Sequence, residues 1–183
     1  MHIELMDSSA NDEWNCVWGS DYYSANRFYT FYCKDVHAHH AYKWIWKSKL
    51  QMKLKVFMWF LLADRLNTRN MLKRRHYNIG EVFDCLLCGQ QIEETVDHMI
   101  FTCPFSKACW EKIGIAWPEF DSRLDLIAQI NESERRHLFM EIFLTAAWSL
   151  WKERNKKHFR GVDPSTDSWL ARFKGDFGLL QYR

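Results

Sequence analysis

The sequence predicts a mainly α-helical fold, and three observations support that prediction. Apolar residues recur at intervals of three and four from about residue 42 onward, which places them on one face of a helix. The 183 residues include only three prolines and seven glycines, so long irregular linkers are not expected. Four cysteine and histidine residues in the middle of the chain have the spacing of metal ligands. We therefore expect a small helical domain organised around a metal site, with additional C-terminal helices.

Three segments are expected along the chain. Residues 1–33 mix polar and aromatic residues and are predicted to be irregular, with short strands possible at 14–17 and 28–32. Residues 34–118 form the predicted helical domain that contains the metal ligands. Residues 119–183 form a C-terminal helical region that packs on this domain or follows it.

The first predicted helices precede the metal ligands. Tyr42, Ile45 and Trp46 share one face of a helix that starts after Asp35. A second helix carries lysines on one side and an apolar face on the other, made by Leu54, Phe57, Met58, Leu61 and Leu62. Thr68 is the expected N-cap of a short third helix over residues 69–75.

Further helices are predicted after the first two cysteines. Residues 95–102 form a short helix, and Pro104 begins another that Gly114 ends. Asp121 or Ser122 caps a helix that runs through Ile130. A long helix is predicted from Ser133 to Gly161, and its last turns, residues 152–160, are basic. A final helix begins at Asp163-Pro164-Ser165.

The strongest chemical signal is the spacing C-x2-C-x9-H-x4-C, formed by Cys85, Cys88, His98 and Cys103. Thiolate sulfur and imidazole nitrogen are preferred ligands of Zn²⁺, and four of them complete a tetrahedral shell. A complete shell leaves no position for water or substrate, so the predicted single zinc ion is structural. Gly89 follows the second cysteine and can adopt the left-handed conformation that such a turn favours.

Composition restricts the class of protein. An apolar content of 48% with ten tryptophans indicates a packed core and argues against disorder. The longest apolar runs, such as 56–63, are too short to span a bilayer. Residues 1–10 have no apolar stretch, so a signal or transit peptide is not expected. We therefore expect a nuclear or cytoplasmic protein, whose cysteines bind metal more readily than they form disulfides.

Positive charge is concentrated between residues 43 and 76. This segment holds ten basic residues and one acidic residue, whereas acidic residues outnumber basic ones elsewhere. Clustered cations neutralise phosphates, and the interleaved aromatic residues either stack on bases or belong to the core. The candidate nucleic-acid contacts are Lys47, Lys53, Lys55, Arg69, Lys73, Arg74 and Arg75.

Together these blocks resemble the zinc-binding domain that follows the polymerase in plant LINE-type reverse transcriptases, which belong to non-LTR retrotransposons. The resemblance spans about residues 12–160. It rests on the four ligands, on Trp110, and on the blocks Ile45-Trp46-Lys47, Lys53–Trp59, Arg65–Thr68, Leu72–Arg75, Cys103-Pro104-Phe105 and Trp148–Asn155 with Phe159. It implies a stand-alone or domesticated copy of one accessory domain.

Catalytic signatures are missing from the sequence. There is no adjacent Asp-Asp pair for polymerase metals, no recognisable ribonuclease H carboxylate set, and too short a chain for a polymerase. We therefore expect a protein that is not an enzyme. Its expected partner is nucleic acid, another protein or a second copy of the chain, and neither membrane binding nor a small-molecule substrate is expected. The alternative to nucleic-acid binding is a co-opted protein–protein interaction module, such as an inhibitor-like or antidote-like binder of a host protein.

Several residues leave alternatives open. Asp97 or a backbone carbonyl is expected to orient His98. The pair Glu93-Glu94 is expected to be solvated in a polar turn. The other three cysteines, Cys16, Cys33 and Cys109, are expected to be core or surface thiols. The histidine cluster of His37, His39 and His40 is expected to be a solvated helix start.

Overall fold

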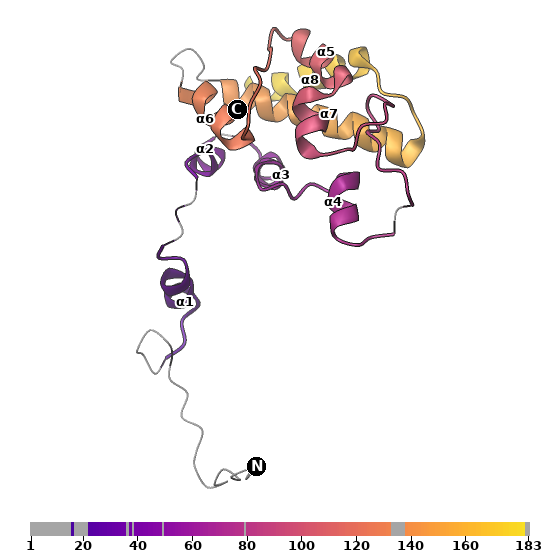
Figure 1. Ribbon diagram of the computed structural model, residues 1–183. Helices are drawn as coiled ribbons and strands as arrows, with labels where there is room; N and C mark the ends of the chain where they lie inside the picture. The colour runs from indigo at the N-terminus through magenta and orange to yellow at the C-terminus, as the bar shows by residue number, and fades with distance from the viewer. Residues whose placement is uncertain are drawn as a thin grey trace, which may run out of the picture. The chain divides into compact units, whose positions relative to one another are not determined.

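The predicted mainly helical fold is confirmed by a computed structural model, which describes residues 16, 22–35, 37, 39–48, 50–78, 80–132 and 138–181. The chain divides into two compact units, Met1–Ala38 and His39–Arg183. The helical elements (Figure 1) are α1 Ala25–Tyr32, α2 Ala41–Lys47, α3 Met52–Leu62, α4 Arg69–Arg74, η1 His98–Thr102, α5 Pro104–Glu111, α6 Arg123–Glu132, α7 Phe139–Arg160 and α8 Thr166–Gln181. Extended pairing within the described ranges is limited to one isolated antiparallel bridge between Asp84 and Glu93.

The first unit contains helix α1, where the sequence predicted a strand over residues 28–32. That prediction is wrong because the segment satisfies its backbone locally. The Ser24 hydroxyl accepts a hydrogen bond from the Arg27 amide at 3.5 Å, and the Phe28 amide donates to the Ser24 carbonyl at 2.9 Å. None of the residues of α1 is buried. The other predicted strand, over 14–17, lies outside the described residues except for Cys16.

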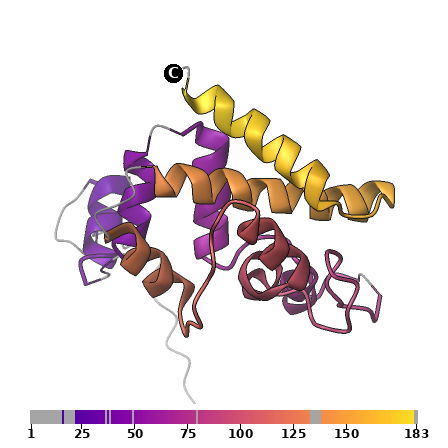
Figure 2. The same ribbon diagram turned by 90° about the horizontal axis from the view of Figure 1, so that it is seen from above.

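The second unit is built on the long helix α7. Figure 2 shows α8 folding back along α7 and α3 crossing it, and both helices contact α7. Helix α3 buries the five apolar residues that the sequence placed on one face, Leu54, Phe57, Met58, Leu61 and Leu62. Burying one such side chain stabilises a fold by about 1.5–3 kcal/mol, so this face holds α3 on the core.

An aromatic cluster connects the centre of the chain to α7. Phe143 of α7 stacks on Phe101 and Trp110, with ring centroids 6.0 and 5.7 Å apart. Trp117 packs edge-on against Phe143 at 5.5 Å. The Trp110 indole N–H donates to the Ile100 carbonyl at 2.7 Å, which satisfies its polar group inside the core.

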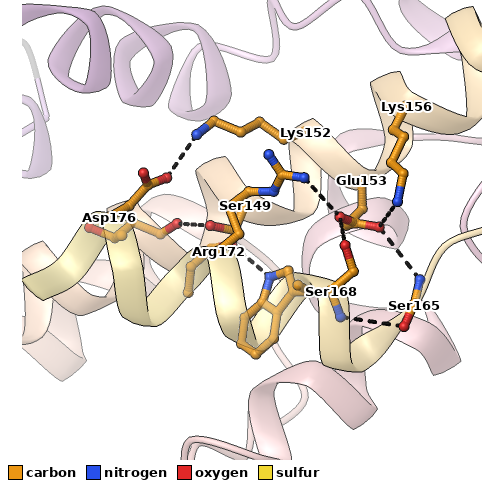
Figure 3. Close-up of polar contacts among 11 residues, drawn as sticks. Ser149, Lys152, Glu153, Lys156, Ser165, Ser168, Arg172 and Asp176 are labelled. Carbon is orange, nitrogen blue, oxygen red and sulfur yellow. Dashed lines mark hydrogen bonds and ion pairs between the residues drawn. The ribbon is translucent and has the colours of Figure 1, made fainter.

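Polar contacts attach α8 to α7 (Figure 3). The fully buried Glu153 accepts hydrogen bonds from the Ser168 hydroxyl at 3.0 Å and from Arg172 at 3.4 Å. Lys152 and Asp176 form an ion pair of 2.7 Å between the same helices. These contacts fix the position of α8 along α7.

The ends of several helices lie where the sequence predicted them. Thr68 caps α4 by accepting from the Met71 amide at 3.2 Å, and Pro104 occupies the first turn of α5. Gly161 ends α7 with φ of +65°. This left-handed conformation is energetically unfavourable for any residue that has a side chain. Ser165 caps α8. The predicted start of the long helix at Ser133 lies outside the described residues.

Candidate metal centre

Cys85 and Cys88 lie on a tight turn held by backbone hydrogen bonds. The Cys85 amide donates to the Ile92 carbonyl at 2.8 Å, and the Gly89 amide donates to the Cys85 carbonyl at 3.1 Å. Gly89 has φ of +64°, the left-handed conformation that the sequence predicted at this position. The turn therefore directs both thiols to the same side.

His98 and Cys103 lie at the two ends of the π-helical turn η1. The Cys103 amide donates to the His98 carbonyl at 2.7 Å, a bond across five residues that widens the turn. The Thr95 hydroxyl accepts from the His98 amide at 3.0 Å and caps the preceding backbone. This geometry presents the imidazole and the thiol to one point, and the short helix predicted over 95–102 is a mixed α and π segment.

The structure brings the four predicted ligands together. The ligand atoms of Cys85, Cys88, His98 and Cys103 all lie within 4.8 Å of one another. The Sγ atoms of Cys85 and Cys103 are 3.9 Å apart, and Cys88 Sγ is 3.5 Å from His98 Nε2. A tetrahedral zinc ion with ordinary bond lengths separates two sulfurs by ~3.8 Å and a sulfur and a nitrogen by ~3.6 Å. The residues present therefore fit one zinc ion.

Backbone amides surround the sulfur atoms. The amides of Leu87 and Cys88 donate to Cys85 Sγ, and the amides of Phe105 and Ser106, in the first turn of α5, donate to Cys103 Sγ. Such donors favour the thiolate that a metal requires.

The pKa values of the two buried thiols move in opposite directions. The pKa of Cys103 is lowered to about 4, chiefly because the Cys85 thiol donates a hydrogen bond to its sulfur. The same hydrogen bond, with burial, raises the pKa of Cys85.

The imidazole of His98 is oriented by Thr102. With Nε2 directed at Cys88, Nδ1 lies 3.3 Å from the Thr102 hydroxyl, which can accept its proton. Asp97, which with a backbone carbonyl was one of the two expected alternatives, instead forms an ion pair with Arg123 at 3.0 Å. Burial raises the pKa of Asp97 despite this arginine.

Glu94 is the residue near this site that the sequence did not identify. We expected it to be solvated, and that prediction is wrong because its side chain is fully buried. It accepts from the Leu86 amide, between the first two cysteines, at 3.2 Å and from the Arg69 amide at 3.0 Å. Arg154 of α7 donates to it through Nε at 3.1 Å and Nη2 at 2.8 Å. Glu94 therefore connects the ligand turn to α4 and α7.

The neighbouring Glu93 is part of the surface, as expected. It forms a 3.1 Å ion pair with Lys73, and a hydrogen bond from that lysine lowers its pKa. The sequence carries no local signal that separates the two glutamates. The partner of Glu94 stands 60 residues further along the chain.

Four of the seven candidate nucleic-acid contacts are engaged within the protein. Lys55 donates to the Trp46 carbonyl at 3.1 Å, and Arg69 donates to the Asp84 carbonyl at 3.2 Å. Lys73 is paired with Glu93, and Arg74 with Asp64. The side chains of the other three are exposed and show no hydrogen bond or ion pair to another described residue, namely Lys47, Lys53 and Arg75.

The remaining cysteines and histidines lie outside the four-ligand cluster. Cys109 is buried, and burial raises its pKa to about 12, whereas Cys33 is exposed. His39 and His40 precede α2, as predicted for a helix start, and the His39 Nδ1 accepts from the Ala41 amide at 3.2 Å. Within the described ranges, no helix combines the length and apolar composition needed to cross a bilayer.

Comparison with known families identifies this arrangement. Residues 23–110 match the family described as zinc-binding in reverse transcriptase, and the match includes all four clustered ligands. Comparison with curated proteins and with solved structures found no match. The match therefore confirms, over residues 23–110, the resemblance to a zinc-binding domain of reverse transcriptase that the sequence suggested.

Proposed function

We propose that this chain is a non-catalytic domain derived from a retroelement, in which one structural zinc ion holds the fold and cationic helices bind RNA or DNA. The zinc role is supported by the donor set. Three thiols and one imidazole occupy all four positions of a tetrahedral shell, so no position remains for a reacting group. The ion supplies cross-linking, because it ties the turn at Cys85 to the start of α5.

The nucleic-acid role is carried by one observation, the exposed cations of the segment 43–76. This segment has ten basic residues and one acidic residue, and its acid, Asp64, is already paired with Arg74 and Arg123. Within this segment, Lys47, Lys53 and Arg75 are exposed at separate positions. Phosphate groups are the natural counterions for such a surface.

Salt dependence tests this role directly. Affinity for a labelled oligonucleotide should fall linearly with the logarithm of salt concentration, and reversing charge at Lys47, Lys53 and Arg75 should weaken binding and flatten the slope. Each lost phosphate contact removes about 0.7–0.9 from the slope. Lys107→Glu, on the exposed side of α5, is the matched control and should leave the slope unchanged. Wild-type protein without salt-dependent binding would refute the proposal.

A second candidate is a protein-interaction module, and the outer face of α3 favours it. Met52, Val56, Trp59 and Phe60 are 64%, 36%, 43% and 36% exposed, and an exposed group of large apolar side chains is typical of an interaction surface. Sedimentation of the full chain tests this candidate through self-association. Association that Trp59→Ser abolishes and that charge reversal at Lys47 leaves intact would support it over nucleic-acid binding.

A further inference from the structure

Two adjoining hollows lie on the surface formed by α3, α7 and α8. The first has a volume of about 470 Å³ and lies beside the last turns of α7 and Arg172 of α8. The second has a volume of about 380 Å³ and lies between α3 and α7, and Arg75 is among its lining residues. Trp148 and Trp151 of α7 line both. We call the pair the α3–α7 groove.

The charge of this groove has one sign. Its lining residues include Lys53, Arg65 and Arg75 on the α3 side and, on the α7–α8 side, Lys152, Lys156, Arg160 and Arg172. None of the described residues that line it is acidic. Lys152 is paired with Asp176, and both Lys156 and Arg172 are paired with Glu153, as Figure 3 shows. The unbalanced charge of the groove therefore lies on Lys53, Arg65, Arg75 and Arg160. A polyanion is the complementary ligand.

The groove also contains aromatic surface held in place from below. The buried Phe57 packs edge-on against Trp148, with ring centroids 5.0 Å apart, and contacts Trp151 at 6.4 Å. Phe159, in the last turn of α7, is 75% exposed. Aromatic rings beside a cationic track are the surface on which unpaired bases stack.

The aromatic surface is connected to the metal centre. The Arg154 guanidinium lies 5.1 Å from the Trp151 ring centre, and Glu94 holds that guanidinium on one side and the Leu86 amide on the other. The position of Trp151 therefore depends on the turn that carries the first two cysteines. A domain whose binding surface is fixed through its metal turn presents that surface ready for a ligand.

We infer that the α3–α7 groove is the binding site for single-stranded nucleic acid, with phosphates on Lys53, Arg75 and Arg160 and bases against Trp151 and Phe159. This inference rests on the proposed nucleic-acid role and places it on α7, where the sequence had suggested no contact. A duplex has its bases stacked internally and cannot use the aromatic rings, so single strands bind more tightly than the same sequence paired. An acidic peptide satisfies the cations but leaves the ring faces unused.

Fluorescence anisotropy with a labelled oligonucleotide of mixed sequence, single-stranded or annealed, tests the site. Phe159→Ala removes an exposed ring without opening the core and should weaken single-strand binding about fivefold or more. Arg160→Glu should weaken it and flatten the salt slope. The matched controls are Trp46→Ala, an exposed ring on α2, and Lys174→Glu, two positions from Arg172 on α8. Both controls should bind as wild type.

The outcomes separate this inference from the proposed function. If wild type binds in a salt-dependent manner but Phe159→Ala and Arg160→Glu bind equally well, the groove is the wrong site and the proposed function stands. If wild type binds no oligonucleotide, both fall. Tighter binding of polyglutamate than of single strands would overturn the inference in favour of an acidic protein partner. Ultraviolet cross-linking, read by mass spectrometry, should place the oligonucleotide on the peptide that contains Phe159, and a cross-link confined to α2 would contradict it.

Discussion

The buried carboxylate of Glu94 offers the sharpest test of how the metal turn is held in the fold. Its two oxygens accept four hydrogen bonds, two from the Arg154 guanidinium and two from the Leu86 and Arg69 amides, at 2.8–3.2 Å. The side chains of Glu94 and Arg154 are 0% and 3% exposed. We predict that Glu94→Gln is strongly destabilising, because the amide that replaces one oxygen is a donor facing donors.

The magnitude follows from burial. Breaking a buried ion pair by removing one partner costs about 3–5 kcal/mol, because the remaining charge stays in the interior without compensation. A domain of this kind has a total stability of about 5–15 kcal/mol, so the loss removes a large share of it. The double variant Glu94→Gln with Arg154→Met removes the stranded charge. It should therefore be more stable than the sum of the two single effects implies, by about 2 kcal/mol.

Urea denaturation of the zinc-loaded protein, followed by far-UV circular dichroism, measures these free energies. Glu93→Gln is the matched control, because the adjacent glutamate forms a surface ion pair with Lys73 that is worth about 1 kcal/mol or less. If Glu94→Gln and Glu93→Gln unfold at the same urea concentration, or if the two changes in the double variant add without coupling, the role assigned to Glu94 is wrong.

Three further predictions concern the metal, a buried thiol and a helix end. Cys88→Ser should lose tightly bound zinc and much of its helical signal, because metal affinity here is also folding free energy, and unchanged metal content by elemental analysis would contradict the site. The raised pKa of Cys109, about 12 against an ordinary 9.0, favours the neutral thiol in the fold; stability should be full below pH 9 and fall as pH approaches 12. Urea denaturation across that range should show a smaller decline in Cys109→Ala. Gly161→Ala should lower stability by about 1 kcal/mol because of its positive φ, and an unchanged melting temperature would refute that account.

Much of the local structure could be predicted from the sequence alone. Thr68, Gly89 and Pro104 act through their own backbone neighbours, so their roles at a cap, a turn and a first helical turn were predictable. The buried face of α3 followed from periodicity alone. Residues 28–32 were misread because aromatic residues suit strands and helices alike, and the Ser24 cap decided the outcome.

The sequence did not predict which of the charged residues are available to bind a ligand. All seven candidate nucleic-acid contacts look alike in the sequence, yet Lys55 and Arg69 donate to backbone carbonyls while Lys53 and Arg75 border the α3–α7 groove. A cation's availability depends on acceptors that reach it through space. Its neighbours along the chain do not supply that information.

By itself, the sequence determined the helical periods and several helix ends, because each of these depends on residues within a few positions of one another. It also determined the four zinc-type ligands, because they lie in recognisable order within one segment, residues 85–103. Only the tertiary structure decided that Glu94 is buried against Arg154 and that α7 adds aromatic and cationic residues to the surface of α3. Burial and ion pairing join residues whose separation along the chain is large. Such partners are chosen by packing, and local pattern does not record the choice.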